Sequence, residues 1–452
     1  MKSRLPYSLK NLLAIWQQQE YEPRLFREWV AAEPRETALT HHIQGLQPEK
    51  WTKKIQLIYR ISQFFTLIAI PKTTAILWST ALLRPVENMS KWGVMWRARR
   101  KLRRAQRNGL KVIAVAGSYG KTSLKHSVHH VLSNHFFTLM TPASYNTPLG
   151  IAHTITTQLR NDHQCFIVEL GEYQKGDIDM LLELVRPDFG ILTPVGFAHM
   201  ERFKTRENLL ATFAEMFTSQ WAPTTVLIDD QNRSLLSPPT YRKIIWYGSK
   251  AKSDIQLRDF TSDLYGSSFT VRFQNRDLTA TTPLLAKHQI HNALPGLWLT
   301  ATLNHSWTQA ARSLQYHIPI SRRLEVHRNP NNTWVIDNSY NTNPGSWKES
   351  VEILEQFQEK NVMVLASGFV ELDAETTHQA HLEMAKDLSR VATIVGVLPT
   401  RYNADLRDAL RKKTSLTLLE GLTREEILHK LSLLGKRVDI IWLEGGLREM
   451  YQ

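Results

Sequence analysis

A buried strand, a glycine-rich turn and a helix follow one another at residues 111–135, and this succession constrains the fold most. Residues 111–116 read KVIAVA, the turn reads GSYGKTS at 117–123, and LKHSVHHVLSNH follows with helical spacing. Gly117 and Gly120 permit a tight turn, so the amides of Ser118 and Tyr119 and the helix N-terminus can face phosphate oxygens. Lys121 can reach terminal phosphates, and Thr122 can place its hydroxyl on Mg²⁺, with Ser123 completing the loop. The common loop pattern has glycine where this chain has Val115, so this is a shorter form of the phosphate loop.

The chain has 452 residues and a formal net charge of +14, and the whole excess lies at its start. Residues 1–111 hold 21 Lys and Arg against 7 Glu, whereas residues 112–452 hold 35 basic and 35 acidic residues. Apolar residues make up 42%, which is ordinary for globular proteins. The one cysteine, Cys165, excludes an internal disulfide framework and a four-cysteine zinc site. Cys165 comes directly before a predicted buried strand, where we expect a small core residue.

The basic N-terminal quarter contains an apolar stretch at residues 64–83, in which 13 of 20 residues are apolar. Pro71 and Lys72 lie in its middle, and a cation at mid-bilayer costs about 3 kcal/mol, which disfavours a clean span. We expect a shallow hairpin or an interfacial helix pair with Lys72 at its turn. Residues 84–111 then hold ten Lys and Arg and one Glu. An anionic membrane surface and a soluble helical domain with a basic linker both explain the pattern, and no nucleic-acid reader motif accompanies it.

Strand-like runs alternate with helical patterns after the loop, which predicts an α/β protein. Residues 111–320 are expected to form an ATP-binding domain with a mainly parallel sheet, and residues 262–284 to add β-hairpins to it. A second alternation predicts a smaller Rossmann-like domain over residues 321–452. Residues 1–110 are left as a helical N-terminal module. Histidines 126, 129, 130, 378 and 381 lie on predicted helices, and we expect surface positions for them rather than a metal site.

Six segments, taken in chain order, resemble the Mur ligases, the ATP-dependent amide-bond ligases of peptidoglycan synthesis. They follow a loop of the same type and read TPASYNTPLGIA at 141–152, FIVELGEY at 166–173, ILTPVGFAHMERF at 191–203, KHQIHNALPGLWLTATL at 287–303, RRLEV at 322–326 and VIDNSYNTNPGSWKES at 335–350. The last of these and ASGFVELDAETTHQAH at 366–381 look similar to the MurF branch, which adds D-alanyl-D-alanine.

The resemblance implies a fold and a set of site residues. It implies a phosphate-loop Mur ligase central domain and a Rossmann-like C-terminal domain that closes over ATP. It assigns catalytic roles to Lys121, Glu169 and His199, and Mg²⁺ binding to Thr122, Glu169 and His199. The residues implied for ATP binding are Gly117, Ser118, Tyr119, Gly120, Lys121, Thr122, Ser123, Asn146, Asn292, Arg323 and Asp337.

The activity implied is an ATP- and Mg²⁺-dependent ligation of a carboxylate to an amine through an acyl phosphate. ATP is needed because a carboxylate and an amine do not condense in water, and cations must neutralise the charge that moves with the phosphoryl group. The implied partners are a small-molecule or UDP-linked muramyl peptide and an amino acid or dipeptide, in the cytoplasm or at the inner face of the plasma membrane. Two alternatives stay open: a related ligase with another acceptor, and a catalytically weak nucleotide-binding scaffold at the membrane.

This chain departs from the family pattern in two places. Phe213 stands where several Mur ligases carry a carbamylated lysine that helps to hold a second Mg²⁺, while Glu215, two residues on, is kept. Phenylalanine cannot bind a metal, so a single metal, a ligand from elsewhere and lost activity are the three readings. Residues 1–110 show no α/β pattern similar to the domain that holds the UDP-sugar in Mur ligases, so recognition of a UDP-linked acceptor is not implied.

Overall fold

The computed structural model divides the chain into two compact units, residues 1–97 and residues 98–452. It describes residues 12–13, 53–67 and 72–445, except for 144, 197–202, 275, 304, 318, 331, 341, 358, 370–373, 398–402, 414, 422–425, 428 and 431–436. The first part of the predicted helical N-terminal module, residues 1–52 apart from 12 and 13, therefore lies outside the described residues. Each unit is described below by itself.

The first unit contains a helix pair, α4 (Lys53–Leu67) and the first part of α5 (Lys72–Arg107). The two helices meet through small and aromatic side chains, since Ser62 Oγ lies 2.9 Å from Ser79 Oγ and the ring of Phe65 packs edge-on against Trp78. The apolar stretch thus falls within a helix pair, with Lys72 as the first residue of the second helix, while a place at a membrane interface stays a prediction. No helix among the residues that the structure describes is both long enough and apolar enough to span a bilayer.

The last turns of α5 belong to the second unit, where they end on helix α8 (Asp177–Val185). Arg103 donates hydrogen bonds to the backbone oxygens of Glu183, Leu184 and Val185, at 2.9, 3.2 and 3.2 Å. Free carbonyls carry the negative end of a helix dipole, so a guanidinium suits this position. Part of the basic run therefore holds the last turns of α5 against α8.

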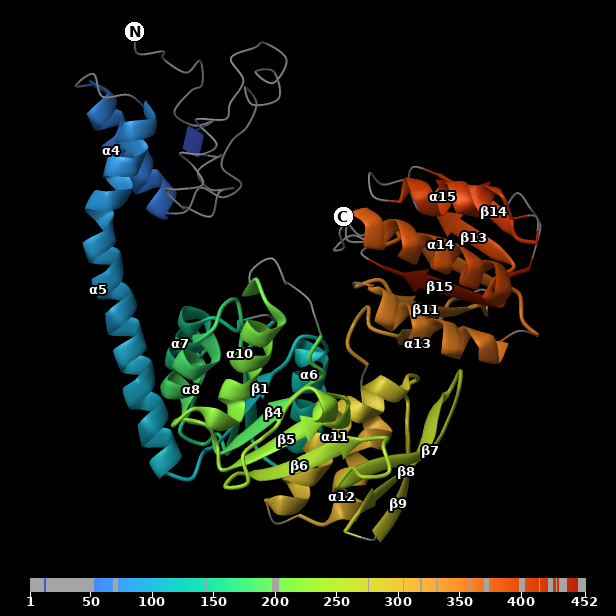
Figure 1. The fold of residues 1–452 in the computed structure, drawn as a ribbon, viewed down its shortest axis with the longest axis horizontal. Helices are drawn as coiled ribbons and strands as arrows, with labels where there is room; N and C mark the ends of the chain where they lie inside the picture. The colour runs from blue at the N-terminus through green and yellow to red at the C-terminus, as the bar shows by residue number, and fades with distance from the viewer. Residues whose placement is uncertain are drawn as a thin grey trace. The chain divides into compact units, whose positions relative to one another are not determined.

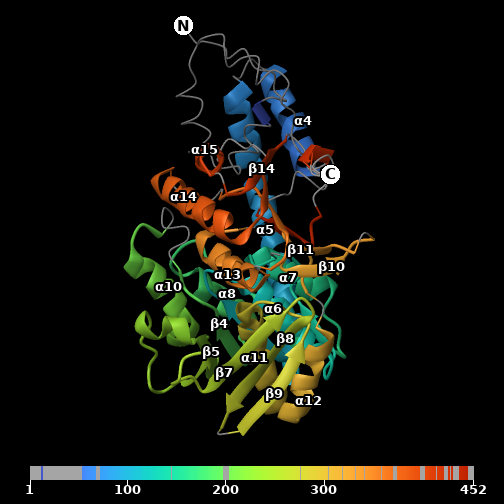
Figure 2. The ribbon, with the colours of Figure 1, turned by 90° about the vertical axis from the view of Figure 1, so that its right-hand side faces the viewer.

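The larger sheet of the second unit has nine strands in the order β2-β3-β1-β4-β5-β6-β7-β8-β9. Its strands are β1 (Lys111–Ala116), β2 (Thr138–Met140), β3 (Cys165–Glu169), β4 (Phe189–Leu192), β5 (Thr225–Asp229), β6 (Lys243–Gly248), β7 (Ile255–Asp263), β8 (Gly266–Phe273) and β9 (Arg276–Thr282). Strands β2 to β7 pair in parallel, and β7, β8 and β9 pair antiparallel. The expected hairpins therefore extend the edge of the parallel sheet, as Figures 1 and 2 show.

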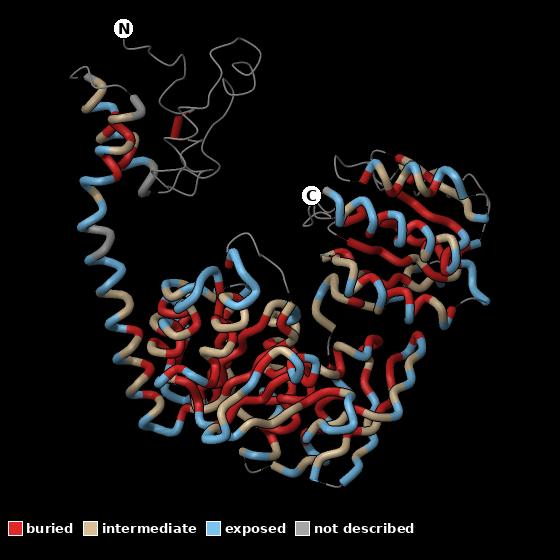
Figure 3. The backbone as a smooth tube through the Cα atoms, viewed as in Figure 1, coloured by how far each residue is buried: buried red, intermediate tan, exposed pale blue. Residues whose placement is uncertain are grey.

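Helices cover both faces of this sheet, which explains why its central strands are apolar throughout. Helices α6 (Lys121–Ser133) and α11 (Lys287–Thr302) pack against each other and on one face, where Leu124 and Leu297 join Ile113 and Ile167 in one core. Helices α7 (Pro148–Thr157), α8 and α10 (Arg206–Thr218) complete the layer of helices around the strands. Figure 3 shows the central strands buried and the outer faces of the helices exposed.

The smaller sheet has six strands in the order β10-β11-β15-β12-β13-β14. They are β10 (Glu325–Arg328), β11 (Trp334–Asn338), β12 (Val362–Ala366), β13 (Ile394–Val397), β14 (Thr417–Glu420) and β15 (Ile440–Glu444), parallel except for β10. Helices α13 (Pro344–Leu354), α14 (Ala374–Val391) and α15 (Ala404–Arg411) pack around it, and α12 (Trp307–Ser313) precedes it in the chain. This is the expected Rossmann-like pattern, so the α/β fold class is confirmed for both predicted regions.

The expectation of surface histidines is only partly right. His126, His129 and His130 on α6 are half-buried, with His130 Nε2 3.0 Å from the Ser313 carbonyl, and burial lowers the pKa of His126 to about 4. His381 is fully buried, and its Nε2 accepts a hydrogen bond from the Phe369 amide, whereas His378 is exposed and pairs with Asp405. Among the residues that the structure describes, no three or more histidine, cysteine, aspartate or glutamate side chains are grouped so that they could hold a metal ion.

Candidate active site at the phosphate loop

Three adjacent strands bring the phosphate loop and the first predicted carboxylate to one edge of the larger sheet. Strand β1 lies between β3 and β4, and its register places Val115 beside Glu169 and Ala116 beside Leu192. The carboxyl ends of parallel strands are where open α/β sheets bind ligands. Gly117 is required here, because its φ is +135° and a Cβ would lie 1.9 Å from Thr193 Oγ1.

The loop ends at helix α6, whose first residue is Lys121. Gly120 precedes it with a φ of +77°, a conformation that a side chain would strain. The Lys121 ammonium lies 2.6 Å from Glu172 Oε1 and also contacts the Gly117 carbonyl. Lys121 is therefore held beside the loop and the N-terminus of the helix, where cationic and dipolar attraction to phosphate add together.

Glu169 is the centre of a buried polar cluster. Its Oε2 accepts a hydrogen bond from Thr122 Oγ1 at 3.1 Å and lies 3.0 Å from Lys125 Nζ. Its Oε1 accepts a hydrogen bond from Asn146 Nδ2 at 3.3 Å. The structure thus brings together three residues that the sequence pointed to, Thr122, Asn146 and Glu169, and adds Lys125, whose side chain is fully buried.

The charged groups at this edge leave one net positive charge. Two ammonium groups, on Lys121 and Lys125, face two carboxylates, on Glu169 and Glu172, and the Arg323 guanidinium adds a third cation near Glu169. Burial raises the pKa of Glu172, and the nearby Lys121 ammonium opposes that rise. A polyphosphate ligand carries more negative charge than this, so the site would need further cations to bind one.

The other residues implied for ATP binding come from later parts of the chain. Asn292 lies on α11, and its Oδ1 is 3.7 Å from where a Cβ on Gly120 would be, so it is beside the loop. Arg323 lies in the chain between α12 and β10. Its guanidinium donates a hydrogen bond to Ser123 Oγ at 2.6 Å and stacks on the ring of Tyr340. Asp337, on β11, is buried and accepts a hydrogen bond from the Ser339 amide at 2.9 Å.

The remaining predicted metal ligand, His199, lies outside the described residues. Phe213 on α10 is fully buried with other apolar side chains, so it fills core space in place of a polar group. Glu215 uses both carboxylate oxygens as an N-terminal cap of α8, accepting from the amides of Gly176 and Asp179 at 2.8 and 2.9 Å. Glu215, which the chain shares with the family pattern although Phe213 departs from it, therefore caps the N-terminus of α8.

Sequence reasoning missed two charged residues of this site, Lys125 and Glu172. A signal for each was present: Lys125 lies four residues after Lys121 and so on the same face of the predicted helix. Glu172 lies three residues after Glu169 within the same quoted segment. Neither signal says what the side chain meets, because their partners come from other strands and loops.

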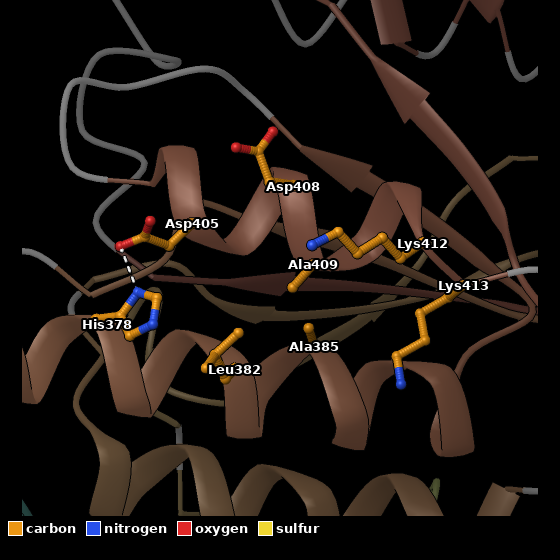
Figure 4. Close-up of a pocket in the computed structure, with 8 residues that line it drawn as sticks. All are labelled: His378, Leu382, Ala385, Asp405, Asp408, Ala409, Lys412 and Lys413. Carbon is orange, nitrogen blue, oxygen red and sulfur yellow. Dashed lines mark ion pairs between the residues drawn. The ribbon is translucent and has the colours of Figure 1, made fainter.

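A pocket lies on the smaller domain, between α14 and α15. It has a volume of about 430 Å³ and is lined by His378, Leu382, Ala385, Asp405, Asp408, Ala409, Lys412 and Lys413. Figure 4 shows the His378–Asp405 ion pair at one end and the two lysines at the other. It contains none of the residues predicted for the site.

The fold and the loop define the class of this chain: an α/β protein with a phosphate loop at the carboxyl edge of a parallel sheet. Residues 115–299 match the Mur ligase middle domain family. Over these residues the chain is similar to the Mur ligases, and it is MurF-like in its curated relatives and in its fold.

Two curated ligases of the same printed name are similar in sequence to parts of this chain. The UDP-N-acetylmuramoyl-tripeptide–D-alanyl-D-alanine ligase of Bacillus subtilis (strain 168) is 28% identical over 298 residues, covering 65% of this chain and 64% of the relative. The ligase of the same name from Escherichia coli (strain K12) is 26% identical over 270 residues, covering 59% of each. The chain therefore spans about three fifths of the length of these relatives.

Solved structures show the same fold. MurF from Thermotoga maritima in complex with ADP aligns with a TM-score of 0.66 at 22% identity, covering 79% of this chain and 80% of that one. A crystal structure of MurF from Acinetobacter baumannii aligns with a TM-score of 0.69 at 21% identity, covering 79% and 78%.

Proposed function

We propose that this protein is an ATP-dependent carboxylate–amine ligase of the MurF type. The observation that carries the proposal is the cluster at the sheet edge, in which the loop lysine and the loop threonine each meet a buried carboxylate. Phosphoryl transfer needs this combination of a backbone cradle, a cation and metal-binding oxygens. The names of the curated relatives support the same activity.

The reaction proposed has two steps. A carboxylate oxygen of the acceptor attacks the γ-phosphorus of ATP, the bond to ADP breaks, and an acyl phosphate forms. The amine nitrogen of the second substrate then attacks the acyl carbon, and the tetrahedral adduct loses inorganic phosphate and a proton to leave the amide. The loop amides and Lys121 bind and orient the phosphates, because they lie at the N-terminus of α6.

Oxygen atoms suited to Mg²⁺ are present in the same cluster. Thr122 Oγ1 and the Glu169 carboxylate are hard oxygen donors of the type Mg²⁺ prefers, and they lie 3.1 Å apart. We propose that these two residues hold the ion, and that His199 serves the second metal that the family resemblance implies. When bound, Mg²⁺ neutralises phosphate charge during transfer.

Nucleotide binding is proposed to involve both sheets. Asn146, Asn292, Arg323 and Asp337 complete the ATP site around the loop residues 117–123. The position of Arg323 supports this, because the residue comes directly before β10 of the smaller sheet and donates a hydrogen bond to Ser123 in the loop of the larger sheet. We propose the domain limits 1–110, 111–320 and 321–452.

The substrates proposed are a UDP-linked muramyl tripeptide and D-alanyl-D-alanine. The test is release of inorganic phosphate from ATP by the full-length protein with both substrates, with either one, and with neither. We expect release only with both, and loss of release in Lys121→Met. Turnover with another carboxylate acceptor would indicate the related-ligase alternative, and ATP binding without any turnover would indicate the scaffold.

We also propose that the first unit places the protein on an anionic membrane surface at the inner face of the plasma membrane. One face of α5 carries the apolar stripe Trp78, Leu82, Met89, Trp92 and Trp96, which are 50% to 74% exposed. Their spacings of four, seven, three and four residues place them on one side of the helix. Exposed Arg84, Lys91 and Arg97 lie off the stripe on the same length of helix, and cations on the polar side of an interfacial helix favour anionic lipid.

A pair of matched variants tests this placement. Full-length protein is expected to sediment with phosphatidylglycerol-containing vesicles, and the double variant Met89→Glu/Trp92→Glu to remain in the supernatant. The control Tyr241→Glu/Tyr265→Glu changes two equally exposed residues by the same charge and should sediment like the unaltered protein. Equal behaviour of both double variants, or no sedimentation of the unaltered protein, would refute a lipid surface as the partner of α5.

A further inference from the structure

Glu172 is a buried carboxylate with one oxygen in use and one without a partner. Its side chain is 8% exposed, and Oε1 binds Lys121 at 2.6 Å. Among the residues that the structure describes, Oε2 is buried and has no hydrogen-bond donor. A buried, unsatisfied charged oxygen is costly, so its retention beside the phosphate loop calls for a ligand.

We propose that Glu172 Oε2 is a ligand of a second divalent cation at the phosphate site, distinct from the one assigned to Thr122 and Glu169. The inference rests on the proposed function. Glu172 thus supplies a carboxylate ligand for the second cation, because Phe213, at the position of the carbamylated lysine of several Mur ligases, cannot bind a metal.

The other acidic residue that the sequence offered for this role is already occupied. Both oxygens of Glu215 accept amide hydrogens at the start of α8. Phe213 is in the apolar core. Glu172 differs from Glu215 because one of its oxygens keeps its full capacity to bind a cation.

The position of Glu172 suits a cation that neutralises phosphate charge. Its Oε1 holds the Lys121 ammonium, which itself contacts the Gly117 carbonyl of the loop. Glu169, three residues earlier, ends β3 at the same edge of the sheet. Lys121, Lys125 and Arg323 against Glu169 and Glu172 leave one net positive charge, which is less than the negative charge of a nucleotide triphosphate and an acceptor carboxylate, and a second divalent cation supplies more.

The experiment counts bound Mn²⁺ in the full-length protein by electron paramagnetic resonance, with the non-hydrolysable nucleotide β,γ-methylene-ATP present. We expect two Mn²⁺ per chain in the unaltered protein and one in Glu172→Gln. Glu172→Asp keeps the carboxylate and should retain the second Mn²⁺ with at least tenfold weaker binding. Glu215→Gln, the matched control, should retain two.

The possible results separate this inference from the proposed function. Calorimetric titration with the nucleotide comes first, and a protein that does not bind it contradicts both proposals. Binding of nucleotide with a single Mn²⁺ in the unaltered protein overturns the second site alone. Two Mn²⁺ of unchanged affinity in Glu172→Gln overturn the role of Glu172, since glutamine keeps the size of the side chain and loses its charge.

Discussion

The buried ion pair between Lys125 and Glu169 gives the sharpest stability prediction. Lys125 is fully buried, Glu169 is 2% exposed, and Nζ lies 3.0 Å from Oε2. Lys125→Met keeps the length of the side chain and removes its charge, which leaves Glu169 with only the neutral donors of Thr122 and Asn146. Removing one partner of a buried pair costs about 3–5 kcal/mol, so we expect a loss of that size in the free energy of unfolding.

A double variant separates the charge from the packing. Lys125→Met/Glu169→Gln removes both charges and keeps an oxygen for Thr122, so it should recover all but about 1–2 kcal/mol of the loss. The control Lys175→Met changes an exposed lysine and should alter the free energy by no more than about 0.5 kcal/mol.

The assay is urea denaturation, with hydrogen exchange of the amides of α6 and β3 as the local measurement. Both elements carry one partner of the pair, so their amides should lose protection in the single variant and regain most of it in the double variant. A single variant within about 1 kcal/mol of the unaltered protein, or a double variant no more stable than the single one, would refute an uncompensated buried charge as the cause.

Three further predictions concern the body of the protein. Phe213→Ala should lower the free energy of unfolding by about 3–5 kcal/mol in urea denaturation, because it opens a cavity in the core. A much smaller loss would show that Phe213 does not fill core space. Arg103→Ala should cost about 1–2 kcal/mol and increase hydrogen exchange in the last turn of α8, whose carbonyls lose their donors. Burial raises the pKa of Asp229 from 3.8 to about 7, so the folded protein keeps a proton that the unfolded chain loses, and stability should fall as the pH rises between these values. Asp229→Asn should abolish that fall and be more stable above pH 7, by up to about 4 kcal/mol, in thermal unfolding between pH 4 and 8; equal pH profiles would contradict it.

Elements with strong local patterns could be predicted from the sequence. The run KVIAVA became β1, and the helix after GSYGKTS became α6, because apolar β-branched residues and the glycine turn act over a few residues. The cluster of Thr122, Asn146 and Glu169 could also be predicted, since these residues follow or end the neighbouring strands β1, β2 and β3. Their contacts agree with the roles proposed for them.

Contacts made over long sequence separations could not be predicted. The half-buried state of His130 depends on a contact with the carbonyl of Ser313, which lies 183 residues later in the chain. The basic run at 97–104 looked uniform, yet Arg103 meets carbonyls some 80 residues away while Arg97 and Arg100 are exposed. Glu172 and Glu215 are the same residue type, and only their surroundings make one a helix cap and the other a candidate metal ligand.

The most direct test of the central claim follows one oxygen atom. The acceptor is prepared with ¹⁸O in both oxygens of its reacting carboxylate and incubated with the protein, ATP, Mg²⁺ and D-alanyl-D-alanine. Activation through an acyl phosphate transfers one of these oxygens to phosphorus, so mass spectrometry should find one ¹⁸O in each inorganic phosphate released and one in the amide product. Unlabelled phosphate, or phosphate released without amide, would contradict the account of this protein as an acyl-phosphate ligase.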